Sequence, residues 1–260
     1  MNILVCIKQI AELNIAGILS SQTRLDIPTD TRFRMNRFDE YAIESAVILK
    51  EQIEDCTIDV VTVGPESADN ILKRAMGMGA DNAIRIDINP KNYYSPFSIS
   101  NLLSKIPRIR SYDLILTGIM SEDEMNAQTG QMLAAQLNMP SVTGVVAIDL
   151  NINKLYVERE REGGTKEQLI VLMPALLTIQ AGINQPRYPS LSALLRAKKK
   201  DIQIIQIDNN DMDNDQSIMR ICPAEKNRKG KTLTGSISQK AREFIEILNE
   251  KGVLWCPKKY

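Results

Sequence analysis

No histidine occurs anywhere in the 260 residues of the chain. Histidine-based acid–base catalysis and histidine ligation of a metal are therefore excluded, which disfavours most hydrolase chemistries. Cysteine is also scarce: Cys6, Cys56, Cys222 and Cys256 lie far apart in the sequence, and no two of them form a CxxC pair. Neither a disulfide framework nor a cysteine metal site is expected, and the default environment is a reducing, intracellular one.

An excess of one charge and a long apolar run are missing as well. The 32 basic and 32 acidic residues cancel, so no overall field attracts the chain to nucleic acid or to a membrane. No run of about 18 apolar residues is present, which excludes a transmembrane helix. The apolar stretch at residues 1–7 is too short for a signal peptide and lacks a cleavage site. We therefore expect a cytoplasmic protein.

Short apolar runs alternate with amphipathic helical patterns over the first half of the chain. Apolar strands of this kind are typical of a parallel sheet that helices cover on both faces. We predict a doubly wound α/β fold, in which ligands bind at the carboxyl ends of the strands. The predicted strands are residues 3–7, 58–63, 83–86 and 114–116, and the predicted helices are residues 40–51, 68–76 and 131–137.

From about Val142 the pattern changes to strands that are joined by short turns. The fold is therefore predicted as a mostly parallel sheet with an antiparallel extension. On pattern alone, this region is also typical of an ordinary hairpin at a sheet edge. The predicted strands are residues 145–150, 154–161, 167–173 and 175–179, with turns at 151–153 and 162–164.

The last part of the chain is predicted to form a C-terminal arm. Residues 208–216 are polar and acidic, which is typical of a linker. Beyond it, residues 236–250 give the clearest amphipathic helix, with Ser238 as a candidate N-cap. Such a helix either folds back on its own core or docks on another chain. We predict a core domain at residues 1–207, followed by the linker and helical arm at residues 208–260.

The loop at residues 118–130 follows a predicted strand and precedes a predicted helix. Asn126, Gln128 and Thr129 would present donors at the helix N-terminus, an arrangement that favours a phosphate. The same spacing is also typical of a simple capped helix. The loop is neither a GxGxxG fingerprint nor a Walker A loop, so no standard motif identifies a cofactor. Its three consecutive carboxylates, at residues 122–124, suit ribose or adenine recognition better than a bare triphosphate.

Two segments resemble one family in detail. The first is VEREREGG at residues 157–164, followed by PALLT at residues 174–178, and the second is GINQPRY at residues 182–188. Both resemble the electron transfer flavoprotein β subunits, and the similarity spans nearly the whole chain. Residues 235–238 and the helix after them most resemble the branch that serves bacterial trimethylamine dehydrogenase. Further similar segments are residues 3–9, 35–36, 44–46, 63–65, 75–81, 128–130 and 184–200.

This resemblance implies an electron-carrier subunit rather than an enzyme. The chain would pair with an α subunit that holds most of a redox-active FAD, and its C-terminal arm would cross to the FAD domain of that subunit. The β subunit itself would bury an AMP with a structural role. Leu13 and Phe38 would lie near the FAD, Leu13 replacing an aromatic residue of some members. The implied AMP contacts are Cys6, Asn36, Val63, Ser121, Glu124, Asn126, Ala127, Gln128 and Thr129, with Ala127 in place of a side-chain amide of some members.

The resemblance also implies a surface for a partner dehydrogenase. It lies within residues 184–200, here named the recognition segment, a loop that runs into a short helix predicted at residues 192–200. Leu191 would insert into a pocket of the dehydrogenase, and the cationic end of the segment would steer the encounter. The alternative is that Leu191 packs into the protein's own core. The partner-binding residues implied here are Leu191, Tyr188, Arg196 and Lys199.

A second partner contact falls in the VEREREGG hairpin. In the family, a glutamate of this segment helps to hold the mobile FAD domain through a pair with an arginine of the α subunit. The resemblance assigns that role to Glu158, with Glu160 as the alternative. Exposed pairs of this kind contribute only about 0–1 kcal/mol, which suits a domain that swings between orientations.

Two other functions remain open at this point. An electron-bifurcating β subunit would hold a second FAD in place of AMP, but such members usually have an arginine where this chain has Ile119 and a proline where it has Gln131. A free-standing adenine-nucleotide-binding protein is the alternative from another class. The lack of histidine, of a Walker lysine and of an evident metal carboxylate cluster argues against catalysis. The unpartnered terminal helix argues against a monomer.

Overall fold

The computed structural model of the protein describes residues 1–12, 18–21, 24–26, 31–90, 92–151, 154–207, 219–220 and 230–253. The chain divides into two compact units, residues 1–221 and residues 222–260. The predicted linker at residues 208–216 lies outside the described residues. None of the helices in the described ranges has the length and apolar character needed to span a membrane.

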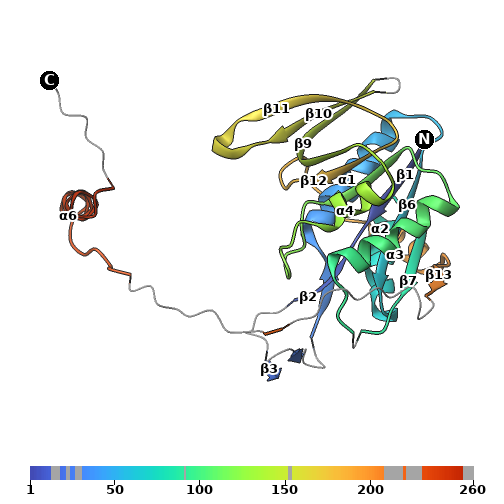
Figure 1. Ribbon diagram of the computed structural model, residues 1–260, viewed down its shortest axis with the longest axis horizontal. Helices are drawn as coiled ribbons and strands as arrows, with labels where there is room; N and C mark the ends of the chain where they lie inside the picture. The colour runs from blue at the N-terminus through green and yellow to red at the C-terminus, as the bar shows by residue number, and fades with distance from the viewer. Residues whose placement is uncertain are drawn as a thin grey trace. The chain divides into compact units, whose positions relative to one another are not determined.

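A nine-stranded sheet forms the centre of the first unit (Figure 1). Its strands are β1 (Asn2–Cys6), β6 (Thr57–Gly64), β7 (Asn82–Asp87), β8 (Leu114–Gly118), β9 (Ser141–Asn151), β10 (Lys154–Glu160), β11 (Lys166–Leu172), β12 (Ala175–Ile179) and β13 (Gln203–Gln206). They lie in the order β11-β10-β9-β12-β8-β1-β6-β7-β13. From β9 to β13 neighbouring strands are parallel, whereas β10 runs antiparallel to both β9 and β11. The predicted α/β fold, a mostly parallel sheet with an antiparallel extension, is confirmed.

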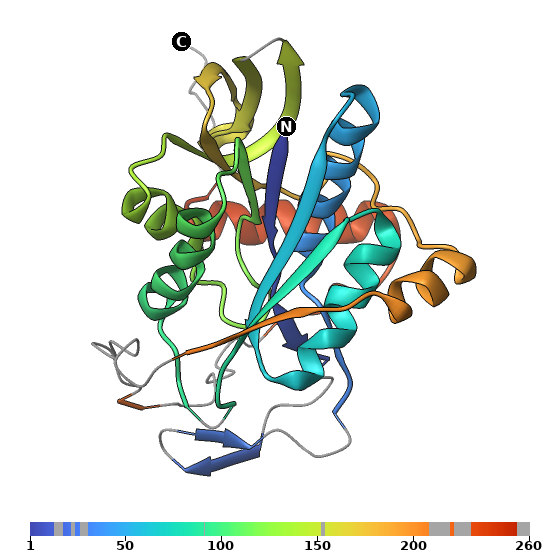
Figure 2. The ribbon, with the colours of Figure 1, turned by 90° about the vertical axis from the view of Figure 1, so that its right-hand side faces the viewer.

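Helices cover both faces of this sheet, as Figure 2 shows with the strands seen between them. Helices α1 (Arg37–Gln52) and α2 (Asp69–Met78) pack on one face, and α3 (Pro96–Ile109) and α4 (Thr129–Gln136) pack on the other. In β1, Ile3 and Val5 belong to the apolar cluster of the first face, while Leu4 and Cys6 belong to that of the second. A strand buried on both faces must be apolar at every position, which explains the continuous runs in the sequence.

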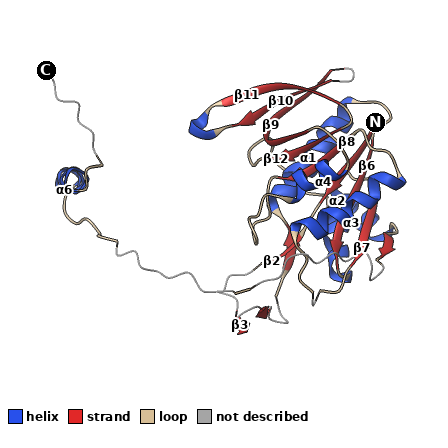
Figure 3. Ribbon diagram, viewed as in Figure 1, coloured by secondary structure: helices blue, strands red, loops and turns tan. Residues whose placement is uncertain are grey.

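Several elements were not predicted. Helix α3 begins with a proline at its first position and has Ser95 as its N-cap, whose Oγ accepts a hydrogen bond from Ser98 N at 3.1 Å. Two short antiparallel ribbons also went unpredicted. They pair β2 (Gln9–Ala11) with β5 (Phe33–Met35) and β3 (Ile18–Ser21) with β4 (Arg24–Asp26). Figure 3 labels one strand of each ribbon, β2 and β3. Strands of three or four residues are too short to show an alternating pattern.

Two helix starts differ from the prediction. Helix α5 (Leu191–Lys199) begins one residue earlier than expected, because Ser190 Oγ accepts a hydrogen bond from Ala193 N at 3.2 Å. Helix α6 (Ile237–Glu250) is present, but Ser238 as its N-cap is wrong. Its N-cap is Ser236, which forms a capping box with Gln239. The turn at residues 162–164 is confirmed as a short 3₁₀ turn.

Candidate functional site

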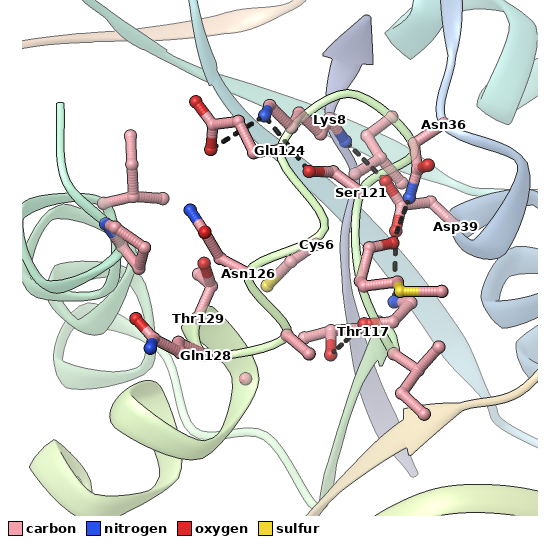
Figure 4. Close-up of a pocket in the computed structure, with 18 of the residues that line it drawn as sticks. Cys6, Lys8, Asn36, Asp39, Thr117, Ser121, Glu124, Asn126, Gln128 and Thr129 are labelled. Carbon is pink, nitrogen blue, oxygen red and sulfur yellow. Dashed lines mark hydrogen bonds and ion pairs between the residues drawn. The ribbon is translucent and has the colours of Figure 1, made fainter. Parts of the chain in front are cut away.

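A pocket lies at the carboxyl ends of β1, β6 and β8, beside the N-terminus of α4 (Figure 4). Strand β1 pairs with β6 on one side and with β8 on the other, so the ends of three neighbouring parallel strands meet there. This is the edge at which a doubly wound sheet is expected to bind its ligand. All nine residues implied as AMP contacts line this one pocket: Cys6, Asn36, Val63, Ser121, Glu124, Asn126, Ala127, Gln128 and Thr129.

The loop that forms one wall of the pocket has an unusual backbone. Met125 and Ala127 both have positive φ, at 53° and 52°, although neither is glycine. Such residues cluster at ligand sites, because surrounding contacts must hold them in a sparsely populated conformation. Gln128 follows with helical φ and ψ and is the N-cap of α4, but its side chain forms no capping bond.

This loop leaves a row of backbone donors unused. Within the described part of the chain, the N–H groups of residues 126–131 have no hydrogen-bond partner. Consecutive N–H groups around a left-handed residue form an anion-binding concavity, and the N-terminus of a helix adds partial positive charge. The arrangement can therefore bind a phosphate. It does not match the alternative of a simple capped helix, because the N-cap Gln128 forms no side-chain capping bond.

Asn36 holds the loop in place. Its Nδ2 donates to the backbone oxygen of Met120 at 2.9 Å, and its Oδ1 accepts from Glu122 N at 3.1 Å. Asn36 is 1 % exposed. Because both ends of the amide are used by the loop, this side chain shapes the pocket wall, while the residue still lines the cavity.

Asp39 joins two strand ends at the base of the pocket. Its carboxylate accepts hydrogen bonds from Lys8 N at 2.7 Å and from Gly118 N at 3.1 Å. The first residue follows β1 and the second ends β8. Burial raises the pKa of this carboxyl to about 7, although the two backbone donors act in the opposite direction.

The acidic residues of the loop are each paired with a cation. Lys8 Nζ lies 2.9 Å from a carboxylate oxygen of Asp123 and 3.3 Å from one of Glu124. Arg34 Nη1 lies 2.7 Å from Glu122 and lowers the pKa of that carboxyl through its hydrogen bond. Lys8 and Arg34 offset two of these three negative charges, which reduces the repulsion of an anion at the start of α4.

The opposite wall of the pocket is apolar. Pro96, Ile99 and Leu103 of α3 line it, at helical spacing, together with Tyr94 from the segment before that helix. The hydroxyl of Tyr94 is buried and has no hydrogen-bond partner. An apolar wall facing a donor-rich loop suits a flat heterocycle joined to a phosphate. Sequence reasoning missed these residues because it missed α3.

Cys6 lines the pocket as a small, buried side chain. Burial and the neighbouring Asp39 raise the pKa of its thiol far above the usual range. The thiolate is therefore not formed near neutral pH, so Cys6 is not a nucleophile. In the ranges that the structure describes, no three acidic or cysteine side chains are grouped so that they could hold a metal ion.

The recognition segment presents three large apolar side chains to solvent. Tyr188 is 87 %, Leu191 74 % and Leu195 53 % exposed. Leu191 therefore does not pack into the core of the described structure, which was the alternative from the sequence. Arg196 and Lys199 are exposed on the same short helix.

In the VEREREGG hairpin, both candidate glutamates already have partners within the chain. Glu158 accepts hydrogen bonds from Gln168 Nε2 at 2.9 Å and from Lys166 Nζ at 3.3 Å. Glu160 accepts one from Gln180 Nε2 at 3.4 Å. These contacts do not select between the two.

The two residues implied to lie near the FAD are only partly described. Phe38 is half-buried at the start of α1, where its Cβ lies beside Gly118, and it does not line the pocket. Leu13 lies outside the described residues.

The fold and the pocket define a doubly wound α/β protein with a pocket at the carboxyl ends of its strands. The electron transfer flavoprotein domain matches residues 26–210. The chain is 35 % identical over 224 residues to the electron transfer flavoprotein subunit beta of Bacillus subtilis, covering 84 % of this chain and 86 % of that one. The subunit beta of Methylophilus methylotrophus is 31 % identical over 261 residues, covering 96 % and 98 %. The human subunit beta is 34 % identical over 209 residues, covering 79 % and 81 %. The chain belongs to the family of electron transfer flavoprotein β subunits.

Proposed function

We propose that the protein is the β subunit of a heterodimeric electron carrier that buries AMP, supports an FAD held mainly by an α subunit, and receives electrons from a dehydrogenase. The observation that carries this proposal is the pocket at the start of α4. The nine implied AMP contacts come from four separate parts of the chain and all line it, and six consecutive N–H groups beside it have no partner among the described residues. A nucleoside monophosphate uses both the donors and the apolar wall.

In the proposed complex the phosphate of AMP binds at residues 127–129. Gln128 and Thr129 supply side-chain donors there, next to the unpaired N–H groups. The base lies against Val63 and the α3 residues Ile99 and Leu103. This placement puts the anion at the positive end of α4, and Lys8 pairs with the nearby carboxylates of Asp123 and Glu124.

Pairing with an α subunit is supported by α6. This helix carries Ile237, Phe244 and Ile245 with large exposed fractions, and none of its residues is buried. An amphipathic helix needs a surface to cover its apolar face. We assign that surface to the α subunit, so residues 208–260 act as a docking arm. FAD, when bound, supplies the redox chemistry of the carrier, and Phe38 is the described residue that we place near it.

Docking of a dehydrogenase is supported by the exposed apolar side chains of the recognition segment. Tyr188 is of a type enriched in interface hot spots, Leu191 is an exposed apolar anchor beside it, and Arg196 and Lys199 add positive charge around them. We expect the partner to offer an apolar pocket with an acidic rim. In the hairpin, we assign Glu158 to the contact with the α subunit, with Glu160 as the alternative.

Nucleotide analysis tests the proposal directly. The chain is co-expressed with its α subunit, the complex is purified, and the nucleotides are released with acid and counted. One FAD and one AMP per heterodimer are expected. Two FAD without AMP would instead indicate an electron-bifurcating subunit, and adenine nucleotide without any flavin or partner would indicate a free-standing nucleotide-binding protein.

A substitution in the recognition segment tests dehydrogenase docking. Leu191→Ala is expected to leave the flavin and AMP content unchanged and to slow reduction by a dehydrogenase purified from the source cells. Truncating a hot-spot leucine typically costs about 1–2 kcal/mol, so the apparent affinity should fall roughly 5- to 30-fold. Ile109→Ala is the matched control, because Ile109 is also 74 % exposed but lies at the end of α3. Equal kinetics of the two variants would rule out the anchor role of Leu191.

A further inference from the structure

One arginine of the recognition segment forms several bonds to α1. Arg187 Nη2 and Nε lie 2.8 Å and 3.0 Å from Glu44 Oε1, and Arg187 N donates to Glu44 Oε2 at 3.0 Å. Arg187 Nη1 reaches Glu51 at 2.6 Å, two turns further along the same helix. One guanidinium thus bridges two carboxylates of α1, immediately before Tyr188.

The burial of Glu44 shows that this contact is not an ordinary surface pair. Glu44 is 4 % exposed, and among the described residues Arg187 is the cation that pairs with it. A buried carboxylate is tolerated when it is paired and hydrogen-bonded. The planar fork of arginine supplies several donors to it at once, which the single ammonium of a lysine does not match.

Contacts on either side of Arg187 extend this attachment. Asn184 Nδ2 donates to Tyr41 O at 3.0 Å and to Ser45 Oγ at 2.9 Å, both in α1. The guanidinium of Arg74 in α2 lies 5.6 Å from the centre of the Tyr188 ring. Residues 184–188 are therefore held from two helices, while the Tyr188 ring stays exposed.

Helix α5 is held against α2 by packing. A Cβ added to Gly77 would lie 2.9 Å from Leu194 Cδ2 and 3.2 Å from Pro189 Cβ, so the glycine lets the two elements approach closely. Ala197 is buried on the same side. Leu191 and Leu195, one helical turn apart, are left on the exposed side.

We propose that Arg187 is a positioning residue that preorganises the recognition segment, so that Tyr188, Leu191 and Leu195 are presented together before any partner arrives. The inference rests on the docking role proposed above for this segment. A segment already held in its bound shape loses less conformational entropy on association, which favours tight docking by a small surface. The anchor acts through α1 and does not line the nucleotide pocket.

Amide hydrogen exchange of the intact heterodimer tests this inference. Arg187→Lys keeps the positive charge and removes the fork. Exchange of the amides of residues 188–199 is expected to accelerate about tenfold or more, while exchange in β1 and β6 stays within about twofold of wild type. With the dehydrogenase, the apparent KM should rise while the limiting rate changes little, because only docking is affected.

Two further variants separate positioning from a general loss of stability. The double variant Glu44→Gln/Arg187→Gln removes both charges, so no buried carboxylate is left unpaired. Amide exchange at residues 188–199 should accelerate in this double variant as it does in Arg187→Lys. Arg159→Lys removes a comparable fork, since Arg159 Nε and Nη2 lie 2.7 Å and 2.6 Å from Glu167 in the hairpin. Arg159→Lys should leave amide exchange at residues 188–199 unchanged.

The inference is overturned if exchange at residues 188–199 stays within about twofold of wild type in both Arg187 variants, because packing on Gly77 would then be sufficient. This result is independent of docking. Unchanged kinetics of Leu191→Ala would end the docking proposal and leave the exchange result standing.

Discussion

The carboxylate of Asp39 accepts a hydrogen bond from the backbone N–H of Lys8 at 2.7 Å. This contact links the first turn of α1 to the segment that follows β1, and Asp39 accepts a second bond from the last residue of β8. The base of the pocket therefore depends on one buried carboxyl group. Its ionisation and the space around it lead to two of the predictions below.

Stability should depend on pH through Asp39. Burial raises the pKa of this carboxyl in the folded protein to about 7, well above its value in the unfolded chain. The folded state therefore binds this proton more tightly than the unfolded chain does. The resulting gain in the free energy of unfolding is fully present below the unfolded pKa of about 4 and is lost as the pH rises to about 7. The slope that one such group contributes is at most about 1.4 kcal/mol per pH unit.

Urea unfolding over a pH series of about 4 to 8 measures this contribution. Asp39→Asn cannot ionise, so its free energy of unfolding should fall less steeply over that range than that of the wild type. Asparagine also presents an NH₂ group that cannot accept from Lys8 N or Gly118 N, so the variant is less stable at acidic pH. Parallel pH profiles for the two proteins would show that Asp39 titrates normally.

Gly118→Ala should distort the base of the pocket. A Cβ at this position would lie 2.7 Å from Phe38 Cβ and 2.9 Å from Phe38 C, and the backbone of α1 cannot move aside as a side chain could. Overpacking of this kind costs about 1–3 kcal/mol. Gly230→Ala is the control, because nothing lies within 4 Å of the added Cβ, and its free energy of unfolding should stay within about 0.5 kcal/mol of wild type. Thermal or urea unfolding of both variants gives the comparison.

Asn36 leads to a prediction on nucleotide retention. Asn36→Asp replaces the donor to Met120 O with a second acceptor, while Glu122 N keeps its acceptor, so residue 120 loses its attachment and faces a carboxylate. One lost hydrogen bond of about 1 kcal/mol should weaken AMP binding roughly fivefold. Asn92→Asp is the control on an exposed residue before α3. Calorimetric titration of the nucleotide-depleted heterodimer with AMP measures the affinity of each variant. Equal AMP affinities of the Asn36 and Asn92 variants would show that the loop keeps its shape without Asn36.

Much of the pocket could be predicted because strand ends and loops leave local signals. The family resemblance implied Cys6 and Val63, and both lie at the carboxyl ends of parallel strands, where such sheets bind ligands; Gln128 and Thr129 stand at a helix start after a strand. The wall formed by α3 could not be predicted from apolar periodicity, because serines occupy many of its buried positions. Ser95 followed by Pro96 is nevertheless a helix-start signal, and it would have located this helix.

The contacts between distant residues could not be predicted from the sequence. Asn36 was expected to touch AMP, yet its amide bonds to residues 84 and 86 positions away. A hydrogen bond over such a separation is set by how the strands are ordered, which local patterns do not encode. The N-cap of α6 is different, since Ser236 and Gln239 have the spacing of a capping box and could have been preferred over Ser238.

Two buried tyrosines provide a final, paired prediction. Tyr94 and Tyr112 are both buried, but Tyr112 OH donates to Asp59 at 2.7 Å, whereas Tyr94 OH has no hydrogen-bond partner. Tyr112→Phe should lower the free energy of unfolding by about 1.5–3 kcal/mol, because it removes a bond to a buried carboxylate. In the nucleotide-free protein, Tyr94→Phe should be neutral or stabilising, because it removes a polar atom that is desolvated without compensation. Urea unfolding of the two variants measures the difference, and a comparable loss of stability in both would mean that the Tyr94 hydroxyl has a partner in solution.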